Sequence, residues 1–204
     1  MDEYARFASL YDPIVGPFLR PIHRGMLAAL SSRQSRKVID ICCGTGLMTG
    51  LASDAGLTPV GVDLSPAMLA VARRKHPHAT FIDSDAASLF FADDAFDAAT
   101  ISFALHEKPE PIALAILGEA QRVVRPGGLI LVADYRLPLP MQARLTGWSI
   151  GMVEWLAGRE HYAHYRRFMD SGGIEFLLGQ AGLVGLPAMT FMSGWAGLFI
   201  NICQ

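Results

Sequence analysis

The sequence lacks an excess of charge of either sign. Its 204 residues carry 17 Lys and Arg against 19 Asp and Glu, for a formal net charge of −2. Proteins that hold nucleic acid by its phosphates usually carry a strong basic excess. We therefore expect no nucleic-acid partner.

Cysteine is also scarce. Cys42 and Cys43 are adjacent, Cys203 is remote, and no Cys-x-x-Cys or Cys/His spacing accompanies them. Such a set forms neither a disulfide framework nor a zinc motif. The first residues show no basic start followed by an apolar run, as a secretory signal would. We expect a reduced, cytoplasmic protein.

Charged residues are missing altogether from residues 176–204, a run long enough to span a bilayer. Five glycines and Pro187 interrupt the run between residues 179 and 197. This composition favours a short helix at 173–181 and an antiparallel pair of buried strands at 186–191 and 196–202 over a transmembrane segment. Peripheral contact with a membrane and the oligomeric state stay open.

The apolar residues, 51% of the chain, follow an alternating pattern of buried strands and helices. This pattern is typical of a mostly parallel sheet covered by helices. Strands are expected at 37–41, 58–63, 79–82, 96–103 and 129–133, and helices at 47–55, 66–76 and 111–124. We expect one domain, with a helical cover (1–34), a ligand-binding core (35–134), a cap (135–170) and a closing helix and strands (171–204).

The turn Asp40-Ile41-Cys42-Cys43-Gly44-Thr45-Gly46 joins the first expected strand to a helix. Glycines there allow a sharp turn and let a ligand approach the backbone. Asp63 ends the next strand, where a carboxylate can accept hydrogen bonds from both hydroxyls of a ribose. Asp63 could instead cap the helix near Ser65, but its spacing from the glycine turn favours ligand binding.

The glycine spacing separates two cofactor classes. A dinucleotide fingerprint needs Gly-x-Gly-x-x-Gly. The place of its third glycine is taken by Thr49, and Gly50 comes one residue late. This spacing, and the lack of a Tyr-x-x-x-Lys pair, count against an NAD(P)-dependent oxidoreductase.

Five segments in this order resemble the class I S-adenosylmethionine (SAM)-dependent methyltransferases, and most of all their small-molecule branch with the ubiquinone/menaquinone-biosynthesis enzymes: 40–46, 61–69, Asp85-Ala86, Phe96-Asp97 and 125–128. The resemblance is strong over 35–134 and looser outside it. It implies a Rossmann-like α/β three-layer sandwich with a mostly parallel, about seven-stranded sheet, an antiparallel closing strand and a helical cap. It also implies methyl transfer from SAM to a small-molecule acceptor, leaving S-adenosylhomocysteine (SAH).

The resemblance assigns cofactor-binding roles to this chain's residues. In the family, the first strand and its turn line the methionine end of SAM. The corresponding residues of this chain are Asp40, Cys42, Gly44, Thr45 and Gly46. The ribose-binding acid corresponds to Asp63, the adenine is flanked by Leu64 or Met68, and its amino group is contacted by Asp85 with the backbone amide of Ala86. Tyr11, followed by Asp12, resembles a Tyr-Asp pair that covers the site, and Phe103 follows the fourth strand, where cofactor-facing residues lie.

One position departs from the family, which usually has glycine where this chain has Cys42. A thiol is small but restricts the backbone, so the cofactor could sit differently or bind less tightly. No neighbouring pattern argues for a lowered thiol pKa. We expect Cys42 and Cys43 to pack rather than react.

The methyl donor is already activated, so the protein must mainly align the acceptor and exclude water. A general base is needed only for an acceptor that is protonated. His106, directly after the fourth strand, is the candidate base, although His106-Glu107-Lys108-Pro109 could be the solvated start of a helix. Tyr135, after the fifth strand, is a candidate substrate contact. No adjacent Asp-Asn pair suggests a catechol-type metal site, and we expect no metal.

Residues 136–167 are rich in Arg, His, Trp and Tyr. They could form an apolar pocket with a cationic rim for an amphiphilic, quinone-like or lipid-like acceptor. The favoured alternative is a helix pair with an aromatic inner face and a solvated basic outer face. The sequence does not identify the acceptor, and a non-catalytic SAM-binding regulatory module is the alternative outside the enzymes.

Overall fold

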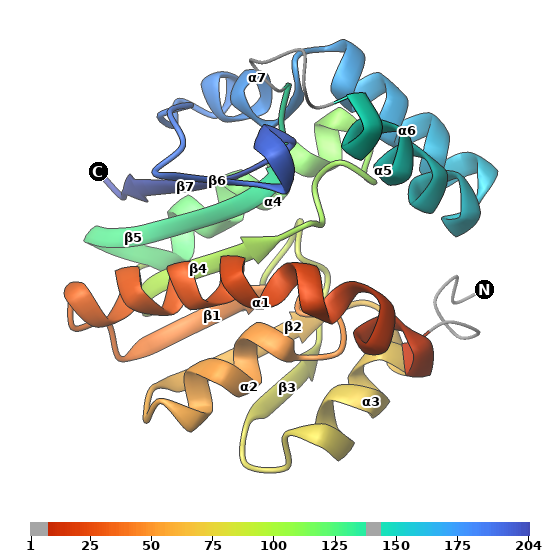
Figure 1. The fold of residues 1–204 in the computed structure, drawn as a ribbon. Helices are drawn as coiled ribbons and strands as arrows, with labels where there is room; N and C mark the ends of the chain where they lie inside the picture. Colours follow the sequence, from red (N-terminus) through yellow and green to blue (C-terminus); the bar gives the residue numbers. More distant parts are fainter. Residues whose placement is uncertain (1–7, 138–143) are drawn as a thin grey trace.

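The computed structural model describes residues 8–137 and 144–204 (Figure 1). Seven strands form one sheet in the order β3-β2-β1-β4-β5-β7-β6. The parallel strands are β1 (Lys37–Ile41), β2 (Thr58–Asp63), β3 (Thr80–Asp83), β4 (Phe96–Ser102) and β5 (Val124–Tyr135), and β7 (Ala196–Ile202) runs antiparallel to both β5 and β6 (Met189–Phe191). The predicted Rossmann-like α/β fold with an antiparallel closing pair is confirmed.

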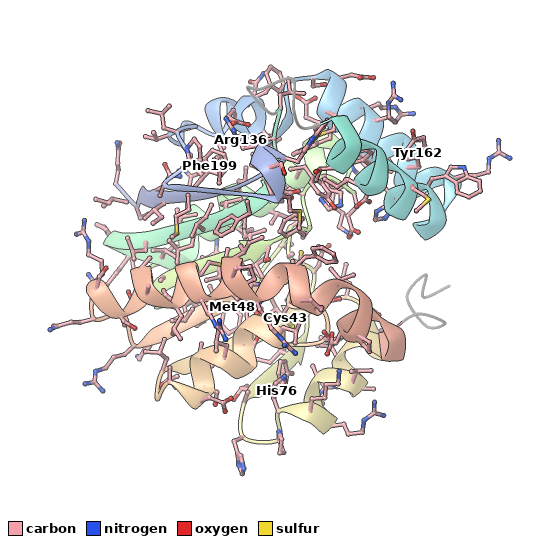
Figure 2. All side chains as sticks on the ribbon, viewed as in Figure 1. Cys43, Met48, His76, Arg136, Tyr162 and Phe199 are labelled. Atoms are coloured by element: carbon pink, nitrogen blue, oxygen red, sulfur yellow. The ribbon has the colours of Figure 1, made fainter. Side chains whose placement is uncertain are left out.

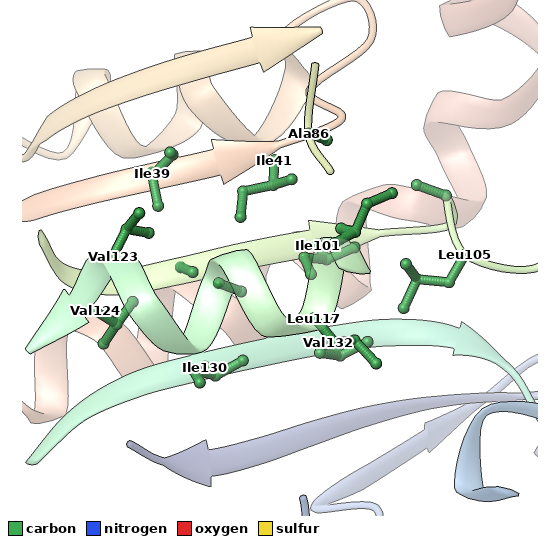
Figure 3. Close-up of a cluster of buried hydrophobic side chains, with 14 of the residues drawn as sticks. Ile39, Ile41, Ala86, Ile101, Leu105, Leu117, Val123, Val124, Ile130 and Val132 are labelled. Atoms are coloured by element: carbon green, nitrogen blue, oxygen red, sulfur yellow. The ribbon is translucent and has the colours of Figure 1, made fainter. Parts of the chain in front are cut away.

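Helices cover both faces of this sheet. One face packs against α1 (Ala8–Ser32) and α2 (Leu47–Asp54), and the other against α4 (Glu110–Val123) and α7 (Gly173–Gln180). Successive side chains of a strand point to opposite faces, so Leu131 of β5 faces α1 and α2 while Ile130 and Val132 face α4 (Figure 3). In Figure 2, Met48 of α2 and Phe199 of β7 mark these two layers.

The remaining helices lie at the ends and edges of the sheet. The helix α3 (Pro66–Lys75) packs on β3, and Ser65 caps it, with its Oγ accepting the Met68 backbone N–H at 3.2 Å. Pro66 stands at the first helical position, as predicted. The cap consists of α5 (Arg144–Ala157) and α6 (Arg159–Asp170), which pack against each other, and the short 3₁₀ turn η2 (Met192–Gly194) joins β6 to β7.

β5 is longer than the expected 129–133 because it begins directly after α4. Its pairing with β4 shifts register between Phe96 and Ala98. Gly127 has φ of 78°, and a Cβ on Gly128 would lie 2.5 Å from the carbonyl oxygen of Asp97. The two glycines therefore bend the start of the strand instead of separating it from the helix.

The charge-free segment 176–204 forms the end of α7 and the closing strands β6 and β7, as expected. Among the residues that the structure describes, no helix is long and apolar enough to cross a membrane.

Candidate active site

The sheet order reverses between β1 and β4. The helix after β1 packs on one face and the helix after β4 on the other. In open α/β sheets such a reversal opens a crevice outside the carboxyl ends of the strands, where ligands bind. Six of the fourteen residues predicted for the site lie in the loops after β1 and β4: Cys42, Gly44, Thr45, Gly46, Phe103 and His106.

The loop after β1 turns through backbone conformations that favour glycine. Cys42, Gly44 and Gly46 have φ values of 57°, 54° and 77°. A Cβ on Gly44 would meet nothing within 4 Å, whereas one on Gly46 would lie 2.7 Å from the ring of Phe81. Gly44 therefore leaves open space above the loop, and Gly46 allows the loop to pack on β3.

Asp63 reaches from the end of β2 to this loop. One carboxylate oxygen accepts the Gly44 N–H and the other accepts the Ser65 N–H, each at 2.8 Å. Burial raises the pKa of Asp63, and these two hydrogen bonds oppose the rise. A carboxylate has about four lone-pair positions, so each oxygen keeps room for a further donor. The loop thus orients Asp63 without saturating it.

Asp40 lies deeper than the sequence suggested. It is 2% exposed, and its oxygens accept the hydroxyls of Thr49 at 2.5 Å and Thr100 at 2.8 Å. Burial raises its pKa to about 6, against the two hydroxyl hydrogen bonds. The structure places this carboxyl between β1, α2 and β4, beneath the loop, where it ties the turn to its neighbours.

The other residues predicted for the adenosyl group surround Asp63. Leu64 is 61% exposed next to it, and Met68 is buried on α3. Asp85 is exposed, with one carboxylate oxygen accepting the Ala87 N–H at 2.9 Å, and Ala86 before that amide is buried. Both a carboxylate and an exposed apolar side chain therefore lie on the β2–β3 side of the loop.

The helix α1 covers the loop from the other side. The Thr45 hydroxyl donates to Asp12 of α1 at 2.5 Å, and Asp12 also forms an ion pair with Lys75 of α3. Asp12 thus ties α1 to the loop and to α3. The side chain of Tyr11 lies outside the described part of the structure, and the covering role of the Tyr11-Asp12 pair stays a prediction.

Both cysteines of the loop are poor nucleophiles. Burial, with the nearby charge of Asp63, raises the pKa of the Cys42 thiol, and burial raises that of Cys43. Since the thiolate is the reactive form, neither side chain is activated, as the sequence suggested.

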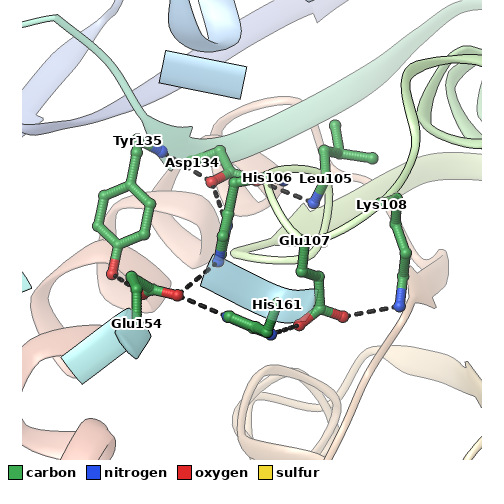
Figure 4. Close-up of polar contacts among 8 residues, drawn as sticks. All are labelled: Leu105, His106, Glu107, Lys108, Asp134, Tyr135, Glu154 and His161. Carbon is green, nitrogen blue, oxygen red and sulfur yellow. Dashed lines mark hydrogen bonds and ion pairs between the residues drawn. The ribbon is translucent and has the colours of Figure 1, made fainter. Parts of the chain in front are cut away.

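A second polar group, the His106 cluster, lies where β4 and β5 meet the cap; it comprises His106, Glu107, Lys108, Asp134, Tyr135, Glu154 and His161 (Figure 4). His106 Nδ1 lies 2.7 Å from Asp134 Oδ1, and His106 Nε2 lies 3.5 Å from Glu154 Oε2. His106 is 4% exposed and Asp134 is fully buried. The ring is therefore held between two carboxylates, one from the sheet and one from the cap, and is not the solvated start of a helix.

Asp134 also fixes the loop after β4. Its Oδ2 accepts the backbone N–H of Leu105 at 3.0 Å and that of His106 at 3.3 Å. Phe103, which begins this loop, has φ of 51°, and its ring meets Tyr135 edge-on at 5.1 Å. The loop therefore holds a non-glycine residue in the left-handed region next to the cluster, which is common at functional sites.

Glu154 of α5 is the centre of the cluster. It accepts the Tyr135 hydroxyl at 2.8 Å on Oε1, while Oε2 lies 2.5 Å from His161 Nε2. His161 Nδ1 in turn lies 3.4 Å from Glu107, whose other oxygen accepts Lys108 Nζ at 2.7 Å. A continuous chain of polar contacts runs from β5 through the cap to the loop after β4.

Charges in the cluster compensate one another. Burial alone would lower the pKa of His106, but Asp134 and Glu154 outweigh it and raise that pKa well above its usual value. Burial alone would raise the pKa of Glu154, but the two imidazoles outweigh it and lower that pKa. Burial and the charge of Glu154 raise the pKa of Tyr135. At neutral pH His106 is charged, Glu154 is ionised and Tyr135 is a neutral phenol.

The cluster adjoins the cofactor loop. The ammonium of Lys108 lowers the pKa of Asp63 and the carboxylate of Glu107 raises it, against the larger effect of burial. The same two charges act on the Cys42 thiol. The residues predicted for the cofactor and the candidate base therefore lie at one edge of the sheet.

Sequence reasoning missed Glu154 as a site residue and treated His161 only as one of many basic residues of the cap. One signal was available, because Glu154 is the only charged residue between 145 and 158. A single carboxylate on an otherwise uncharged helical stretch is buried only with partners.

Some basic residues of the cap are buried in ion pairs, and others are exposed to solvent. Arg136 is buried, and its Nε donates to Glu175 of α7 at 2.6 Å. Arg166 and Arg167 are exposed. A cavity of about 490 Å³ is lined by apolar, basic and acidic residues, among them Leu105, Lys108, Glu110, Arg167, Phe168 and Asp170. The cap helices pack against each other, and binding of an acceptor in this cavity stays a prediction.

Comparison with known proteins gives consistent results. Residues 38–128 match the family model described as a methyltransferase domain. The demethylmenaquinone methyltransferase of Beutenbergia cavernae is 41% identical over 186 residues, covering 86% of this chain and 77% of that protein. The enzyme of the same name from Renibacterium salmoninarum is 41% identical over 138 residues, covering 67% of this chain and 57% of that protein.

Among solved structures, magnesium protoporphyrin IX methyltransferase from Synechocystis with bound SAH superposes with a TM-score of 0.62. The match covers 90% of this chain and 83% of that one at 18% identity, so it speaks to the fold alone. The chain spans between about half and three quarters of the length of the curated relatives it matches.

Proposed function

Because the chain belongs to the class I SAM-dependent methyltransferases, we propose that it methylates a hydroxylated aromatic acceptor of the quinol type. The acceptor would bind between the loop after β1 and the His106 cluster. The observation that carries this proposal is the convergence of Asp63 and a buried acid–imidazole cluster at one sheet edge. The relatives named for demethylmenaquinone support the acceptor class.

The residues at the cofactor loop fit SAM. Asp63 keeps lone pairs for two ribose hydroxyls, and Gly44 leaves space for a ligand against the backbone. Leu64 offers an exposed apolar surface for the adenine, and Asp85 an exposed carboxylate for its amino group. Asp40 supports the turn from beneath.

When bound, SAM supplies an activated methyl carbon. The protein's part is to hold the acceptor in line with that carbon and to exclude water. The contact of Asp12 with Thr45 keeps α1 over the loop and limits access of water from that side.

His106 acts on the acceptor's hydroxyl. Glu154 lies close to His106 Nε2, and its lowered pKa makes it a weak base, so it orients the imidazolium instead of taking the hydroxyl proton. The imidazolium of His106 faces the hydroxyl oxygen and stabilises the oxyanion that forms when the acceptor loses its proton to solvent before transfer. Asp134 fixes the ring through Nδ1, and Tyr135, a neutral phenol, orients Glu154. His106 therefore has an electrostatic role in place of the proton transfer predicted from the sequence.

Binding measurements on the full chain test the cofactor assignment. Titration calorimetry with SAM, SAH and NADH should show binding of the first two and none of the third. Asp63→Ala should weaken both by about 100-fold, because two hydrogen bonds to a charged group are lost. Asp83, which is exposed and aligned with Asp63 in the register of β3 and β2, gives the control Asp83→Ala, with unchanged affinity. Binding of NADH without SAM contradicts the proposal.

Transfer of labelled methyl from SAM to reduced demethylmenaquinone tests the acceptor. His106→Ala should lower turnover and flatten its pH dependence while SAH affinity is kept. Unchanged turnover across the pH range would remove His106 from the mechanism. SAH binding without transfer to any of a panel of phenols and quinols would instead favour a regulatory SAM-binding module.

The structure gives a physical reason against a dinucleotide. The Thr49 side chain, at the place of the third fingerprint glycine, is fully buried and donates to Asp40. Gly50 is needed elsewhere, because a Cβ there would lie 2.2 Å from the ring of His76. Neither residue is arranged to receive a pyrophosphate.

A further inference from the structure

Two imidazoles and one carboxylate of the His106 cluster come together at a common point. One ligand atom from each of His106, His161 and Glu154 lies within 4.8 Å of the other two. The Nε2 atoms of both rings face Glu154 Oε2, at 3.5 Å from His106 and 2.5 Å from His161. His106 and Glu154 are buried, and the His161 side chain is 16% exposed. They come from the loop after β4 and from both cap helices, so the point lies at the junction of cap and core.

The outer contacts of both rings are those of metal-binding histidines. A histidine that ligates a metal usually donates its other ring N–H to a carboxylate or carbonyl, which fixes the tautomer. His106 Nδ1 lies 2.7 Å from Asp134, and His161 Nδ1 lies 3.4 Å from Glu107. In both rings this leaves Nε2, the nitrogen that faces Glu154, to carry the lone pair. The carboxylate is itself held by the hydroxyl of Tyr135.

The charges also suit a divalent cation. Three carboxylates, those of Asp134, Glu154 and Glu107, face two imidazoles and Lys108. With neutral imidazoles as ligands, the three carboxylates and Lys108 leave two negative charges, which one divalent ion balances. The pocket can therefore hold the ion without an uncompensated charge.

We propose that His106, His161 and Glu154 bind a divalent transition-metal ion of the zinc or iron(II) class. Two imidazoles and a carboxylate are ligands that these ions accept. Three protein ligands leave a coordination position vacant, as catalytic metal sites do. That position would take the hydroxyl oxygen of the acceptor, and in the metal-bound form the ion, in place of the imidazolium of His106, would favour the ionised hydroxyl. This role rests on the proposed function, whereas the ion site rests on the cluster alone.

Titration of the full chain, stripped with a chelator, with Zn²⁺ tests the site. We expect one ion to bind per chain. Co²⁺ in place of Zn²⁺ should give visible absorption bands that are characteristic of a cobalt ion with a low coordination number. His161→Ala should weaken binding by about 100-fold or more, since it removes a ligand and not only an outer contact. The matched control is His164→Ala, on the same helix, where His164 lines the separate cavity; its affinity should match the wild type.

A variant outside the ligand set keeps the test decisive if His161→Ala does not fold. Glu107→Gln leaves all three ligands in place and should weaken Zn²⁺ binding by about 10-fold, as loss of an outer carboxylate does. No stoichiometric binding, or equal binding by wild type and both variants, overturns the proposal, because a set of charged hydrogen bonds is then all that the cluster provides.

SAH binding separates this proposal from the proposed function. A chain that binds Zn²⁺ at these residues but neither SAM nor SAH keeps the metal site and loses the methyltransferase assignment. A chain that binds SAH and no metal keeps the assignment and loses the site.

Discussion

Two buried carboxyl groups, Asp40 beneath the cofactor loop and Glu154 in the cap, respond to burial in opposite ways. Asp40 is 2% exposed and Glu154 is 5% exposed. Burial raises the pKa of Asp40 to about 6, whereas the pKa of Glu154 is lowered although burial acts on it in the same direction. Equal burial therefore does not decide the protonation state.

The hydrogen-bond donors that face each carboxyl group decide its protonation state. Asp40 accepts hydrogen bonds from two neutral hydroxyls, which oppose desolvation only in part. Glu154 faces two imidazoles whose charges and hydrogen bonds exceed the desolvation penalty. The loop half of the site thus holds a carboxyl that protonates readily, and the cap half holds one that stays ionised.

The largest effect is expected from breaking the cap cluster. Glu154→Ala leaves His106 and Tyr135 buried without their acceptor, so the free energy of unfolding should fall by about 3–5 kcal/mol in chelator-treated protein. Urea unfolding at pH 7 measures it. The control is Trp155→Ala, the next residue on α5, whose side chain is 60% exposed and should change little. A loss below about 1 kcal/mol would mean that the cluster does not hold the cap.

The variant Asp40→Asn tests the other carboxyl group through the pH dependence of the free energy of unfolding. The folded pKa of about 6 exceeds the ordinary value of 3.8 for this side chain. The folded state therefore binds more protons between these two values, and the free energy of unfolding of the wild type falls as pH rises through them. The pKa shift of about two units corresponds to about 3 kcal/mol. Urea unfolding should show that the wild type loses this free energy of unfolding between pH 4 and 7, relative to Asp40→Asn.

The contribution of Glu154 to the free energy of unfolding should change with pH in the opposite direction. Its folded pKa is depressed, so its contribution is present above the unfolded value and is lost as pH falls. A stability difference between wild type and Asp40→Asn that does not change with pH would contradict the comparison of the two carboxyls.

The smallest effect is expected at Cys42. Its φ of 57° costs a non-glycine residue roughly 1 kcal/mol, and Cys42→Gly removes that cost but makes the unfolded chain more flexible by a similar amount. The melting temperature should hardly change, whereas Cys42→Val, β-branched in the left-handed region, should lower it. A large loss in Cys42→Gly would show that the thiol's packing, and not the backbone contacts of the loop, holds the turn.

Much of the cofactor half could be predicted from the sequence because its parts are local. The turn after β1, Ser65 as the cap of α3 and Asp63 at the end of β2 each depend on neighbours in the chain. The succession of strands along the chain followed from alternating apolar runs. The predicted strand ends are correct to within a few residues except at the start of β5.

The cap half could not be predicted in this way. Glu154 and His161 stand 48 and 55 residues beyond His106, and no periodic pattern links them. Their meeting depends on how α5 and α6 dock on the ends of β4 and β5. The burial of Asp40 beneath the turn could not be predicted either, because Thr100 comes from a strand that only the sheet brings beside it.

By itself, the sequence determined a mostly parallel α/β sheet and the glycine turn with its acid at the next strand, because backbone geometry and apolar periodicity are written in adjacent residues. The methyltransferase family followed from the resemblance of five ordered segments to known members. Only the tertiary structure decided the charge states of Asp40, His106 and Glu154. A pKa depends on burial and on partners within a few ångströms, and those partners are separated by long stretches of chain that folding alone brings together.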